Sequence, residues 1–397
     1  MRPIKKDEVV ELAYDLLRIP SVNPRDRAQV QEEDMLGEIK ICEFIAAWLD
    51  EHKISAQVLH YAPGRANCVA VVGDDKGLTL WLNGHVDTVA PHFLTKDSFV
   101  PHISGDRLYG IGAADMKGGI ASMMVALAAL AGEPPPCRVI FSAVGGEEGP
   151  PSGTEFLLNQ GWLADIAIVG EPTHLTVCAG QRGGMWVQIK SVGRAGHGCI
   201  PEPKVNAVEG LVVYLYTLNE NPPPSFQGGS DAATYNVGIF SGGHRANIIP
   251  SEAHAVLDIR YTSSCNPQQI LEELTRHAEL ITKNKTLCKF SVEVVEGPSE
   301  PLGVLDEFLV SKLAKIVQAT LRRPVRVGWA PFWSDAYYYY KKGIPAFIIG
   351  PGGIEQAHSS NEYVSITELY EAANVYYELA LNLCTDKEVV RYVRNLT

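Results

Sequence analysis

The chain lacks the features that mark exported, membrane-spanning and disulfide-stabilised proteins. Its eight cysteines are scattered over 397 residues, with no C-x-x-C pair and no framework spacing, so a disulfide scaffold is not expected. The amino terminus is charged and has no apolar signal core, and no apolar stretch approaches about 18 residues, so we expect neither export nor a membrane span. Reduced thiols in a cytoplasmic protein fit this composition best.

Positive charge is also scarce. The chain has 34 Lys and Arg against 46 Asp and Glu, which makes a net charge of −12. No dense Lys/Arg run is present, so a nucleic-acid partner is not expected. No internal repeat or low-complexity tract is visible, and the length suits two compact domains, each large enough for a core of its own.

The apolar patterns predict a mixed α/β architecture with an inserted second domain. Strand patterns occur at residues 56–60, 66–73, 78–83, 138–144, 165–169 and 345–349, and helical patterns at 117–131, 152–160, 303–320 and 367–383. Between residues 182 and 298 the order becomes strand, helix, two strands, helix, strand, which is typical of a ferredoxin-like unit. We therefore predict a first domain from residues 1–181 and 299–397, interrupted by an insert from residues 182–298.

The most informative local feature is a histidine and an aspartate directly after a predicted strand. His85 and Asp87 follow the apolar run 78–82, and open α/β sheets hold ligand chemistry at the carboxyl ends of their strands. Taken alone, the pair is more often a capped turn or a surface ion pair. Further acidic and histidine side chains follow other predicted strands or a glycine-rich turn: Asp115, Glu147, Glu148, Glu171 and His358. Their number and placement favour a common metal site.

Asp115 lies in a glycine-rich turn before the helical run 120–130. Gly110 and Gly112 resemble part of a dinucleotide fingerprint, but a carboxylate at the third position of that fingerprint would repel a pyrophosphate. Small neighbours instead leave room for each oxygen of Asp115 to approach its own cation, which is the role of a bridging ligand. The alternative is an N-cap for the helix that follows.

Glu147 and Glu148 stand between glycines after the strand pattern 138–144. Two adjacent carboxylates at the end of an apolar strand repel each other, which raises the pKa of one of them and makes it suitable as a general base. With a cation nearby, one glutamate can be a ligand while the other holds the metal-bound water. The alternative is a solvated acidic turn.

The candidate ligands divide into two sets that share Asp115. We predict that His85 and Glu171 bind one ion and that Glu148 and His358 bind the other. Such a mixture of imidazole and carboxylate is typical of zinc, with cobalt or manganese as further possibilities. Three ligating carboxylates and a bridging hydroxide would balance the charge of two divalent ions, and such a pair can lower the pKa of a shared water toward about 7.

Seven sequence blocks resemble the dinuclear-zinc aminoacylases and exopeptidases, a family that includes acetylornithine deacetylase and succinyl-diaminopimelate desuccinylase. The blocks, in order, are Gly84-His-Val-Asp-Thr-Val, Leu108-Tyr-Gly-x-Gly-x-x-Asp-Met-Lys-Gly-Gly, Glu147-Glu-Gly, Gly170-Glu-Pro-Thr, Gly193-Arg-Ala-Gly-His-Gly, Asn247-Ile-Ile-Pro, and Gly350-Pro-Gly with Ala357-His and Asn361-Glu-Tyr. The resemblance covers nearly the whole chain. It implies a zinc-exopeptidase-like catalytic domain and an insert that serves as lid and dimerisation domain.

The resemblance also assigns roles around the metals. Glu147 resembles the general base that takes a proton from the bridging water and passes it to the leaving amine, and Glu148 resembles the ligand. Asp87 is then expected to fix the tautomer and orientation of His85. A glutamate at position 171 is similar to the deacylase branch of the family, whereas an aspartate there is usual among its peptidases.

In the insert, the resemblance implies contacts with the substrate. His197 is similar to a histidine that reaches across a dimer to polarise the scissile carbonyl, although it can also be satisfied within its own glycine-rich turn. Asn247 is expected to hydrogen-bond the reacting amide, and Arg260 to receive the substrate carboxylate, although it can also be an ordinary exposed strand arginine. Gly353, in the loop after the predicted strand 345–349, is a further expected substrate contact.

The leading hypothesis is a homodimeric metal-dependent amidohydrolase that cleaves N-acyl-L-amino acids by attack of the bridging hydroxide. A dipeptidase or carboxypeptidase with the same centre is the nearest alternative. A catalytically silent binding protein is disfavoured because Glu147 and every expected ligand are present, and a nicotinamide-dependent oxidoreductase because the fingerprint is broken. Ile111, Ser334 with Asp335, and the tyrosines at 337–340 are not diagnostic, which leaves the acyl group open.

Overall fold

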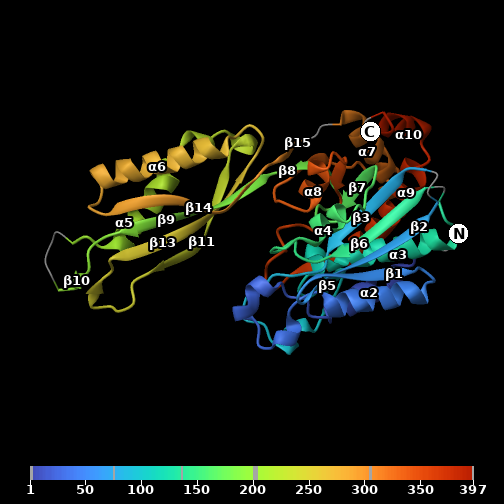
Figure 1. Cartoon of the computed structure of the whole chain (residues 1–397), viewed down its shortest axis with the longest axis horizontal. Coiled ribbons are helices and arrows are strands. Elements are labelled where there is room, and N and C mark those ends of the chain that lie inside the picture. Colours follow the sequence, from blue (N-terminus) through green and yellow to red (C-terminus); the bar gives the residue numbers. More distant parts are fainter. Residues whose placement is uncertain (1–2, 75–76, 136, 200–203, 304–305, 396–397) are drawn as a thin grey trace. The chain divides into compact units, whose positions relative to one another are not determined.

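The computed structural model describes residues 3–74, 77–135, 137–199, 204–303 and 306–395, which form two compact units (Figure 1). The first unit comprises Met1–Gly180, Val304–Ala330 and Ser334–Thr397, and the second comprises Gln181–Gly303 and Pro331–Trp333. The insert predicted at residues 182–298 lies within the second unit, which starts one position earlier and extends a few residues further.

The first unit combines a large mixed sheet with helices. Its strands are β1 (Ala56–Ala62), β2 (Arg65–Gly73), β3 (Thr79–His85), β4 (His102–Ser104), β5 (Arg107–Tyr109), β6 (Arg138–Val144), β7 (Ile166–Val169), β8 (Val177–Gln181), β16 (Val327–Ala330), β17 (Ala346–Ile348) and β18 (Tyr363–Ser365). Its α-helices are α1 (Lys6–Leu17), α2 (Ile39–Glu51), α3 (Gly118–Gly132), α4 (Gly153–Asn159), α7 (Glu307–Leu321), α8 (Ala336–Lys341), α9 (Ile366–Leu383) and α10 (Lys387–Val393).

The large sheet runs in the order β1-β2-β6-β3-β7-β17-β8. Its central strands are parallel: β3 pairs with β6 and β7, and β17 pairs with β7. His85 lies opposite Val144 of β6, and Asn83 lies opposite Val169 of β7. The carboxyl ends of these four strands therefore meet at one edge of the sheet, which is where α/β proteins bind their ligands.

The central strands are buried on both faces, as expected for parallel strands covered by helices. Leu80 and Leu82 of β3 and Phe141 of β6 belong to a core shared with α1, α3 and α9. Trp81 points to the opposite face, where its ring meets that of Tyr339 in α8 edge-on at 5.1 Å. Helices thus pack against both faces of β3. This packing fixes the position of the residues that follow the strand.

One helical segment corrects the sequence analysis. The stretch Ala113–Gly132 is long and apolar enough to cross a membrane by length and composition, so the expectation that no such stretch exists is wrong. The most apolar part of this segment is completely buried inside the first unit, where α3 packs against α1 and α9. Its apolar character is that of a core helix.

Apart from the two-residue strands β10, β12 and β15, the second unit has the order strand, helix, strand, strand, helix, strand that the sequence predicted. Its elements are β9 (Gly183–Val192), β10 (Gly196–His197), α5 (Ala207–Glu220), β11 (Thr234–Gly242), β12 (Ile248–Ile249), β13 (Glu252–Tyr261), α6 (Pro267–Asn284), β14 (Lys289–Ser299) and β15 (Leu302–Gly303). The sheet order β11-β13-β9-β14 is antiparallel throughout, as in ferredoxin-like folds. Val187 and Leu257 share a core with Leu211 of α5 and Leu274 of α6.

The elements that the sequence analysis missed are short or lack a clear period. Strand β8 is five residues long and contains both glycine and alanine, which are poor strand formers. Helix α8 consists mostly of tyrosines, so it shows no apolar stripe of helical spacing. Neither omission changes the fold class, which is the predicted mixed α/β arrangement.

Candidate metal centre

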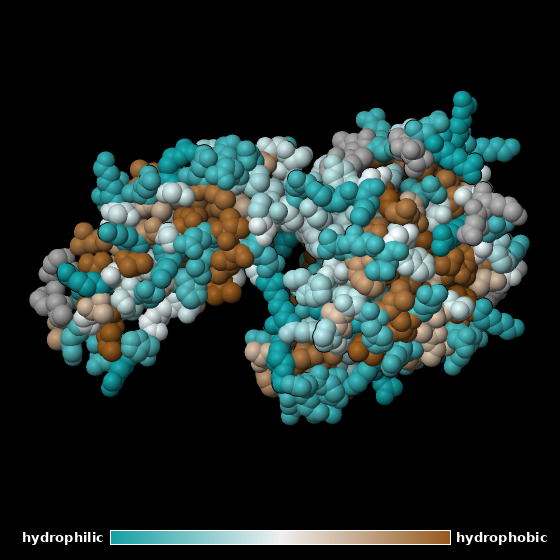
Figure 2. Space-filling model, viewed as in Figure 1, coloured by the Kyte–Doolittle hydropathy of each residue, from teal (hydrophilic) through white to brown (hydrophobic). Residues whose placement is uncertain are grey.

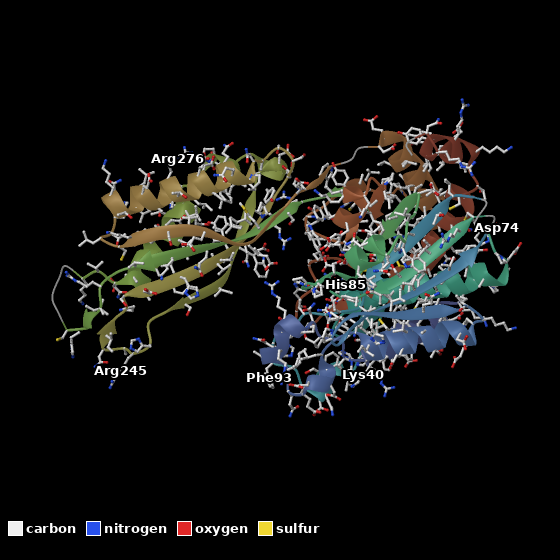
Figure 3. The ribbon with its side chains drawn as sticks, in the orientation of Figure 1. Lys40, Asp74, His85, Phe93, Arg245 and Arg276 are labelled. Atoms are coloured by element: carbon white, nitrogen blue, oxygen red, sulfur yellow. The ribbon has the colours of Figure 1, made fainter. Side chains whose placement is uncertain are left out.

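The sheet edge brings all of the predicted ligands together. His85 ends β3, the two glutamates at 147 and 148 follow β6, and Glu171 follows β7. Because Asn83 pairs with Val169, two further residues along each strand place His85 beside Glu171. His358 comes from the loop after β17, and Asp115 from the helical turn Ala113–Lys117 that precedes α3. Figure 3 labels His85 at this edge of the first unit.

Asp115 faces both histidines, one with each carboxylate oxygen. Its Oδ1 lies 2.9 Å from His85 Nε2, and its Oδ2 lies 3.3 Å from His358 Nε2. His85 Nε2 is also 3.6 Å from Glu171 Oε2, and His358 Nε2 is 3.0 Å from Glu148 Oε1. The two predicted ligand sets are thus present as separate clusters that share Asp115.

The donor atoms fit divalent cations. Within each of the sets His85–Asp115–Glu171 and Asp115–Glu148–His358, the candidate atoms lie within 4.8 Å of one another. Their closest separations bracket the distance of about 3.3 Å expected between two ligands of a tetrahedral zinc at about 2.0 Å. Glu171 Oε1 is buried and has no hydrogen-bond partner among the described residues, which is costly unless a cation or water meets it.

Asp87 acts through different atoms from those expected. The His85 Nδ1–H donates to the main-chain oxygen of Asp87 at 2.8 Å, whereas the Asp87 carboxylate lies 3.7 Å from Nδ1. The main-chain contact assigns the proton to Nδ1 and leaves Nε2 as the metal-binding atom. Asp87 therefore meets the His85 ring through its main-chain oxygen and not through its carboxylate, and its role in orienting His85 stays a prediction.

The Asp87 carboxylate instead holds the loop of the two glutamates. It accepts hydrogen bonds from the main-chain N–H groups of Gly146, Glu147 and Glu148 at 2.9, 3.3 and 3.1 Å, and from Asn23 Nδ2 at 2.8 Å. Three successive N–H groups around one carboxylate form an anion-binding nest. Asp87 thus connects the loop that carries Glu147 and Glu148 to the end of β3, where His85 lies.

Glu147 has the environment of a general base. It reaches the same space as His85 and Glu148, since candidate donor atoms of all three lie within 4.8 Å of one another. Burial raises its pKa well above the ordinary value, and the charges of Glu171 and Glu148 add to that shift. A buried carboxylate with a raised pKa accepts and returns a proton near neutral pH.

The two histidines bind protons strongly in the absence of cations. Burial disfavours protonated His358, but the charge of Glu148 and contact with Asp115 outweigh it and raise the pKa of His358 to about 11. Burial likewise opposes protonation of His85, and the carboxylates of Glu171 and Asp115 nevertheless raise its pKa well above its usual range. Protons therefore occupy the positions that cations would take.

We expect metal uptake at pH 8 to release about two protons, one from each histidine, because imidazole must be neutral to bind a metal. Both pKa values are raised, so the protons remain bound at pH 8 until a cation displaces them. Calorimetric titration of the metal-free protein with Zn²⁺ in two buffers of different ionisation enthalpy measures this release. An enthalpy that is the same in both buffers would show that the histidines are neutral beforehand.

A buried polar network beside the centre was missed. Trp81 Nε1 and Asn83 Nδ2 donate to Ser142 Oγ at 2.8 and 2.9 Å, and Asn83 Nδ2 also donates to Thr154 Oγ1 at 3.0 Å. The Thr154 hydroxyl donates in turn to Asp335 Oδ2 at 2.6 Å. Each side chain looks unremarkable in the sequence, and only the packing of β3, β6, α4 and α8 joins them.

Asp335 is the charged member of that network and is only 1% exposed. Burial raises its pKa to about 6, while its hydrogen bond with Thr154 opposes the shift. Its charge contributes to the raised pKa values of Glu147 and Glu171. In the sequence, Asp335 stands in the Ser334–Asp335 pair before the tyrosine run, where no local feature links it to the metal centre.

The second unit places two of its three predicted residues together. His197 pairs with Ile248 across the β10–β12 ladder, and the Gly198 N–H donates to the Asn247 oxygen at 2.9 Å. His197 Nδ1 accepts a hydrogen bond from the Cys199 N–H at 3.2 Å, which is the local contact that its glycine-rich turn allows. His197 is exposed, so its other ring nitrogen can reach solvent or a ligand.

Arg260 lies in the four-stranded sheet, near the end of β13, whereas His197 belongs to the separate two-stranded β10–β12 sheet. Strand β13 runs from Glu252, just after β12, to Tyr261. At about 3.3 Å per residue, Arg260 is therefore roughly 26 Å along the strand from Glu252. Its Nε is 2.9 Å from Asp258 Oδ1, and its side chain is partly exposed. This ion pair is compatible with the ordinary strand arginine that the sequence left as an alternative.

Gly353 has a packing reason for being glycine. A Cβ atom there would lie 2.1 Å from His174 Nε2, a ring that is held between Glu355 and Glu368 at 2.7 and 3.0 Å. Its bridge with Thr173 joins the loop of Glu171 to the loop of His358. The predicted substrate contact of Gly353 stays a prediction.

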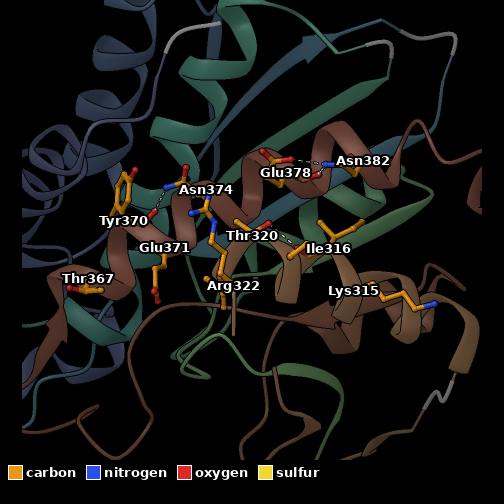
Figure 4. Close-up of a pocket in the computed structure, with 12 residues that line it drawn as sticks. Lys315, Ile316, Thr320, Arg322, Thr367, Tyr370, Glu371, Asn374, Glu378 and Asn382 are labelled. Atoms are coloured by element: carbon orange, nitrogen blue, oxygen red, sulfur yellow. Dashed lines mark hydrogen bonds between the residues drawn. The ribbon is translucent and has the colours of Figure 1, made fainter. Parts of the chain in front are cut away.

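A separate surface groove of about 930 Å³ lies between α7 and α9 (Figure 4). Its polar lining is engaged locally: Asn382 Nδ2 donates to Glu378 Oε2 at 2.7 Å, and Glu371 Oε2 accepts from Arg323 Nη2 at 2.7 Å. None of the predicted ligands lines this groove. The chemistry therefore belongs to the strand ends and not to this hollow.

Sequence relatives carry names from the predicted family. Acetylornithine deacetylase of Proteus mirabilis is 28% identical over 393 residues, which cover 96% of this chain and 98% of the relative. Succinyl-diaminopimelate desuccinylase 2 of a Ruegeria species is 29% identical over 391 residues, covering 92% and 93%. The model of Peptidase family M20/M25/M40 matches residues 81–382.

Solved structures share the fold. A tripeptidase from Staphylococcus aureus superimposes with a TM-score of 0.74 at 20% identity and covers 99% of both chains. Human carnosine dipeptidase 1 has a TM-score of 0.71 at 16% identity, covering 95% of this chain and 96% of that one. A dinuclear metal-binding M20 peptidase from Bacillus subtilis has a TM-score of 0.66 at 17% identity, covering 96% and 98%. Because the family model spans most of the sequence and the ligand clusters are present, the chain belongs to peptidase family M20/M25/M40 and is a metal-dependent amide hydrolase.

Proposed function

We propose that the protein removes the acyl group from N-acyl-L-amino acids, as acetylornithine deacetylases and succinyl-diaminopimelate desuccinylases do by name. The observation that carries this proposal is the convergence of two ligand sets on Asp115, with the partly buried Glu147 within reach of both His85 and Glu148. A glutamate at position 171, in place of the aspartate expected of the peptidases, tilts the substrate toward an acylated amino acid.

The residues around the centre divide the work. Two divalent ions, most simply zinc, would supply Lewis-acid polarisation of the carbonyl and a water of lowered pKa. Glu147 takes the proton of the attacking water and returns it to the leaving nitrogen. Asp87 keeps Glu147 in place through three main-chain N–H groups, so the proton acceptor does not drift during the reaction.

The insert supplies the groups that bind the substrate. Asn247 contacts the amide, His197 donates to the carbonyl oxygen, and Arg260 receives the amino-acid carboxylate. Within one copy, His197 belongs to the β10–β12 sheet, β12 precedes the start of β13 at Glu252, and Arg260 lies eight residues further along β13, a length of roughly 26 Å that exceeds any simple N-acyl amino acid. One copy therefore offers either His197 or Arg260 to a given substrate, which supports a homodimer in which His197 acts on the partner's site.

The surface of the insert supports the same homodimer. Strand β11 is an edge of the sheet, and its Ile239 and Phe240 are 51% and 46% exposed. Helix α5 carries exposed Val212 and Tyr216 one turn apart. Figure 2 shows hydrophobic side chains gathered on the visible face of this unit. A second copy paired edge to edge along β11 would satisfy the free strand edge and cover these side chains.

A cytoplasmic location is part of the proposal. All eight cysteines are free, and most are buried as small apolar side chains, which agrees with a reducing compartment.

Assays on a substrate panel test the deacylase proposal. With added Zn²⁺, Co²⁺ or Mn²⁺, we expect N-acetyl- and N-succinyl-amino acids such as acetylornithine and succinyl-diaminopimelate to be hydrolysed well above a dipeptide panel, measured as release of free amine. A substrate methyl ester serves as control, because it lacks the carboxylate that Arg260 would bind. Hydrolysis of dipeptides alone would overturn the deacylase assignment and favour a peptidase with the same centre.

A further inference from the structure

The Asn361-Glu-Tyr block takes no part in the chemistry above, yet its glutamate is built into the metal centre. Glu362 is only 5% exposed. Its Oε2 accepts the N–H of Gly112 at 2.8 Å, and its Oε1 accepts the N–H groups of Ala114 and Asp115 at 2.8 and 3.0 Å. A single carboxylate thus holds the whole turn that presents Asp115.

The main chain around Glu362 fastens the same turn a second time. The Gly110 N–H donates to the Glu362 carbonyl oxygen at 3.1 Å, and the next residues pair with β5, with Tyr363 opposite Tyr109. Four residues before Glu362 stands His358, whose Nε2 lies 3.3 Å from Asp115 Oδ2. The segment from His358 to β18 therefore supplies one ligand and positions another.

The arrangement repeats that of Asp87 on the other side of the centre. Asp87 follows the ligand His85 and captures three N–H groups of the loop that carries Glu148. Glu362 follows the ligand His358 and captures three N–H groups of the turn that carries Asp115. In each case a histidine ligand is followed by a buried carboxylate that fixes an acidic ligand brought from elsewhere in the chain.

We propose that Glu362 is a positioning residue that aims the two oxygens of Asp115 at the two metal ions. The inference rests on the proposed function of the centre, because it assigns Asp115 as the shared ligand. All three donors face carboxylate oxygens, so the match requires acceptors on both. Without the carboxylate, the turn, which passes through Gly112 at φ +80°, loses three of the hydrogen bonds that hold it, and Asp115 can serve one ion without bridging to the other.

The test replaces Glu362 with glutamine and measures metal binding directly. Glu362→Gln keeps the shape of the side chain but places an NH₂ group opposite at least one N–H donor. We expect Mn²⁺ titration of the metal-free protein, followed by electron paramagnetic resonance, to show affinity lowered by about 10- to 100-fold. At saturating Mn²⁺ we also expect the magnetic coupling between two bridged ions to be replaced by the signal of isolated ions.

Asp106→Asn is the matched control. Asp106 also holds main chain at the start of α9, through the Thr367 N–H at 3.1 Å, but it does not contact the turn of Asp115. Its Mn²⁺ affinity and coupling should equal those of the wild type. Circular dichroism of the metal-free proteins checks that each variant is folded.

Wild-type affinity and coupling in folded Glu362→Gln would overturn the positioning role. If that variant does not fold, Glu362→Asp decides: it keeps the charge but reaches one methylene less far, so a loss in the same direction supports the proposal and unchanged binding overturns it. A wild-type protein that binds no pair of ions would overturn both this role and the proposed function. Coupled ions in a wild-type protein that hydrolyses no N-acyl amino acid would overturn only the substrate assignment.

Discussion

Glu147→Gln is expected to lower turnover by about 10²- to 10⁴-fold, the usual contribution of a general acid–base group, while both metal ions stay bound. The amide that replaces the carboxylate cannot take a proton from water. The two ligand sets that share Asp115 do not include Glu147, so their geometry is unaffected. The loss should appear in kcat for an N-acyl amino acid, with metal content measured by elemental analysis of the same sample.

Asp115→Ala is the contrasting variant. It removes the one carboxylate that both ligand sets share, so metal content should fall together with activity. Glu147 also lies within reach of His85 and Glu148 as a third possible cluster. Loss of metal in Glu147→Gln would therefore reassign Glu147 as a ligand, and full activity in that variant would refute the mechanism.

His197→Ala is expected to lower turnover by about 10²- to 10³-fold, the effect of losing one donor to a developing oxyanion, without loss of metal or of the dimer. His197 is exposed on the β10–β12 ladder. Among the described residues, its ring forms one hydrogen bond, which it accepts from the main chain of Cys199. Its removal therefore leaves the core of the insert intact. Light scattering and metal analysis check the assembly, and steady-state kinetics measure the loss.

Mixing His197→Ala with Glu147→Gln tests whether the histidine acts on the partner. After random exchange of subunits, half of the dimers are mixed, and in each of these one site combines an intact base with an intact histidine, so about a quarter of wild-type activity should return. Two copies of one variant mixed together are the control and should stay inactive. No recovery after proven exchange would assign the histidine to its own subunit.

Much of the fold was predictable because the local pattern and the tertiary environment agree. The apolar run at 78–82 is buried on both faces in β3, and the helical spacing at 367–383 is that of α9. The candidate ligands could be found for the same reason: His85, Glu148 and Glu171 each lie at or after the end of a clear strand, and parallel strands end at one edge. Glu147 and Glu148 follow the end of β6 by only a few residues, so their position at this sheet edge could also be predicted.

Roles that depend on contacts between distant segments could not be predicted in this way. Asp335 accepts a hydrogen bond from Thr154, which lies 181 positions earlier, and Glu362 meets Asp115 across 247 positions. Asp335 has no local pattern that sets it apart from an ordinary polar residue in a loop, and the Asn361-Glu-Tyr block that contains Glu362 does not say which turn the glutamate holds. The hydrogen bond from His85 to the main-chain oxygen of Asp87 could not be predicted either, because every residue has a main-chain carbonyl group and the sequence does not show which one the ring meets.

By itself, the sequence identified the candidate metal ligands, their order along the strands, and the α/β class with a ferredoxin-like pattern in residues 182–298, because periodicity and residue chemistry are local properties. Only the tertiary structure decided how those residues work together. It directed the two oxygens of Asp115 to different histidines, turned the Asp87 carboxylate toward the glutamate loop, and separated His197 from Arg260 within one copy. These outcomes depend on strand register and on main-chain hydrogen bonds, which form only when the chain is folded.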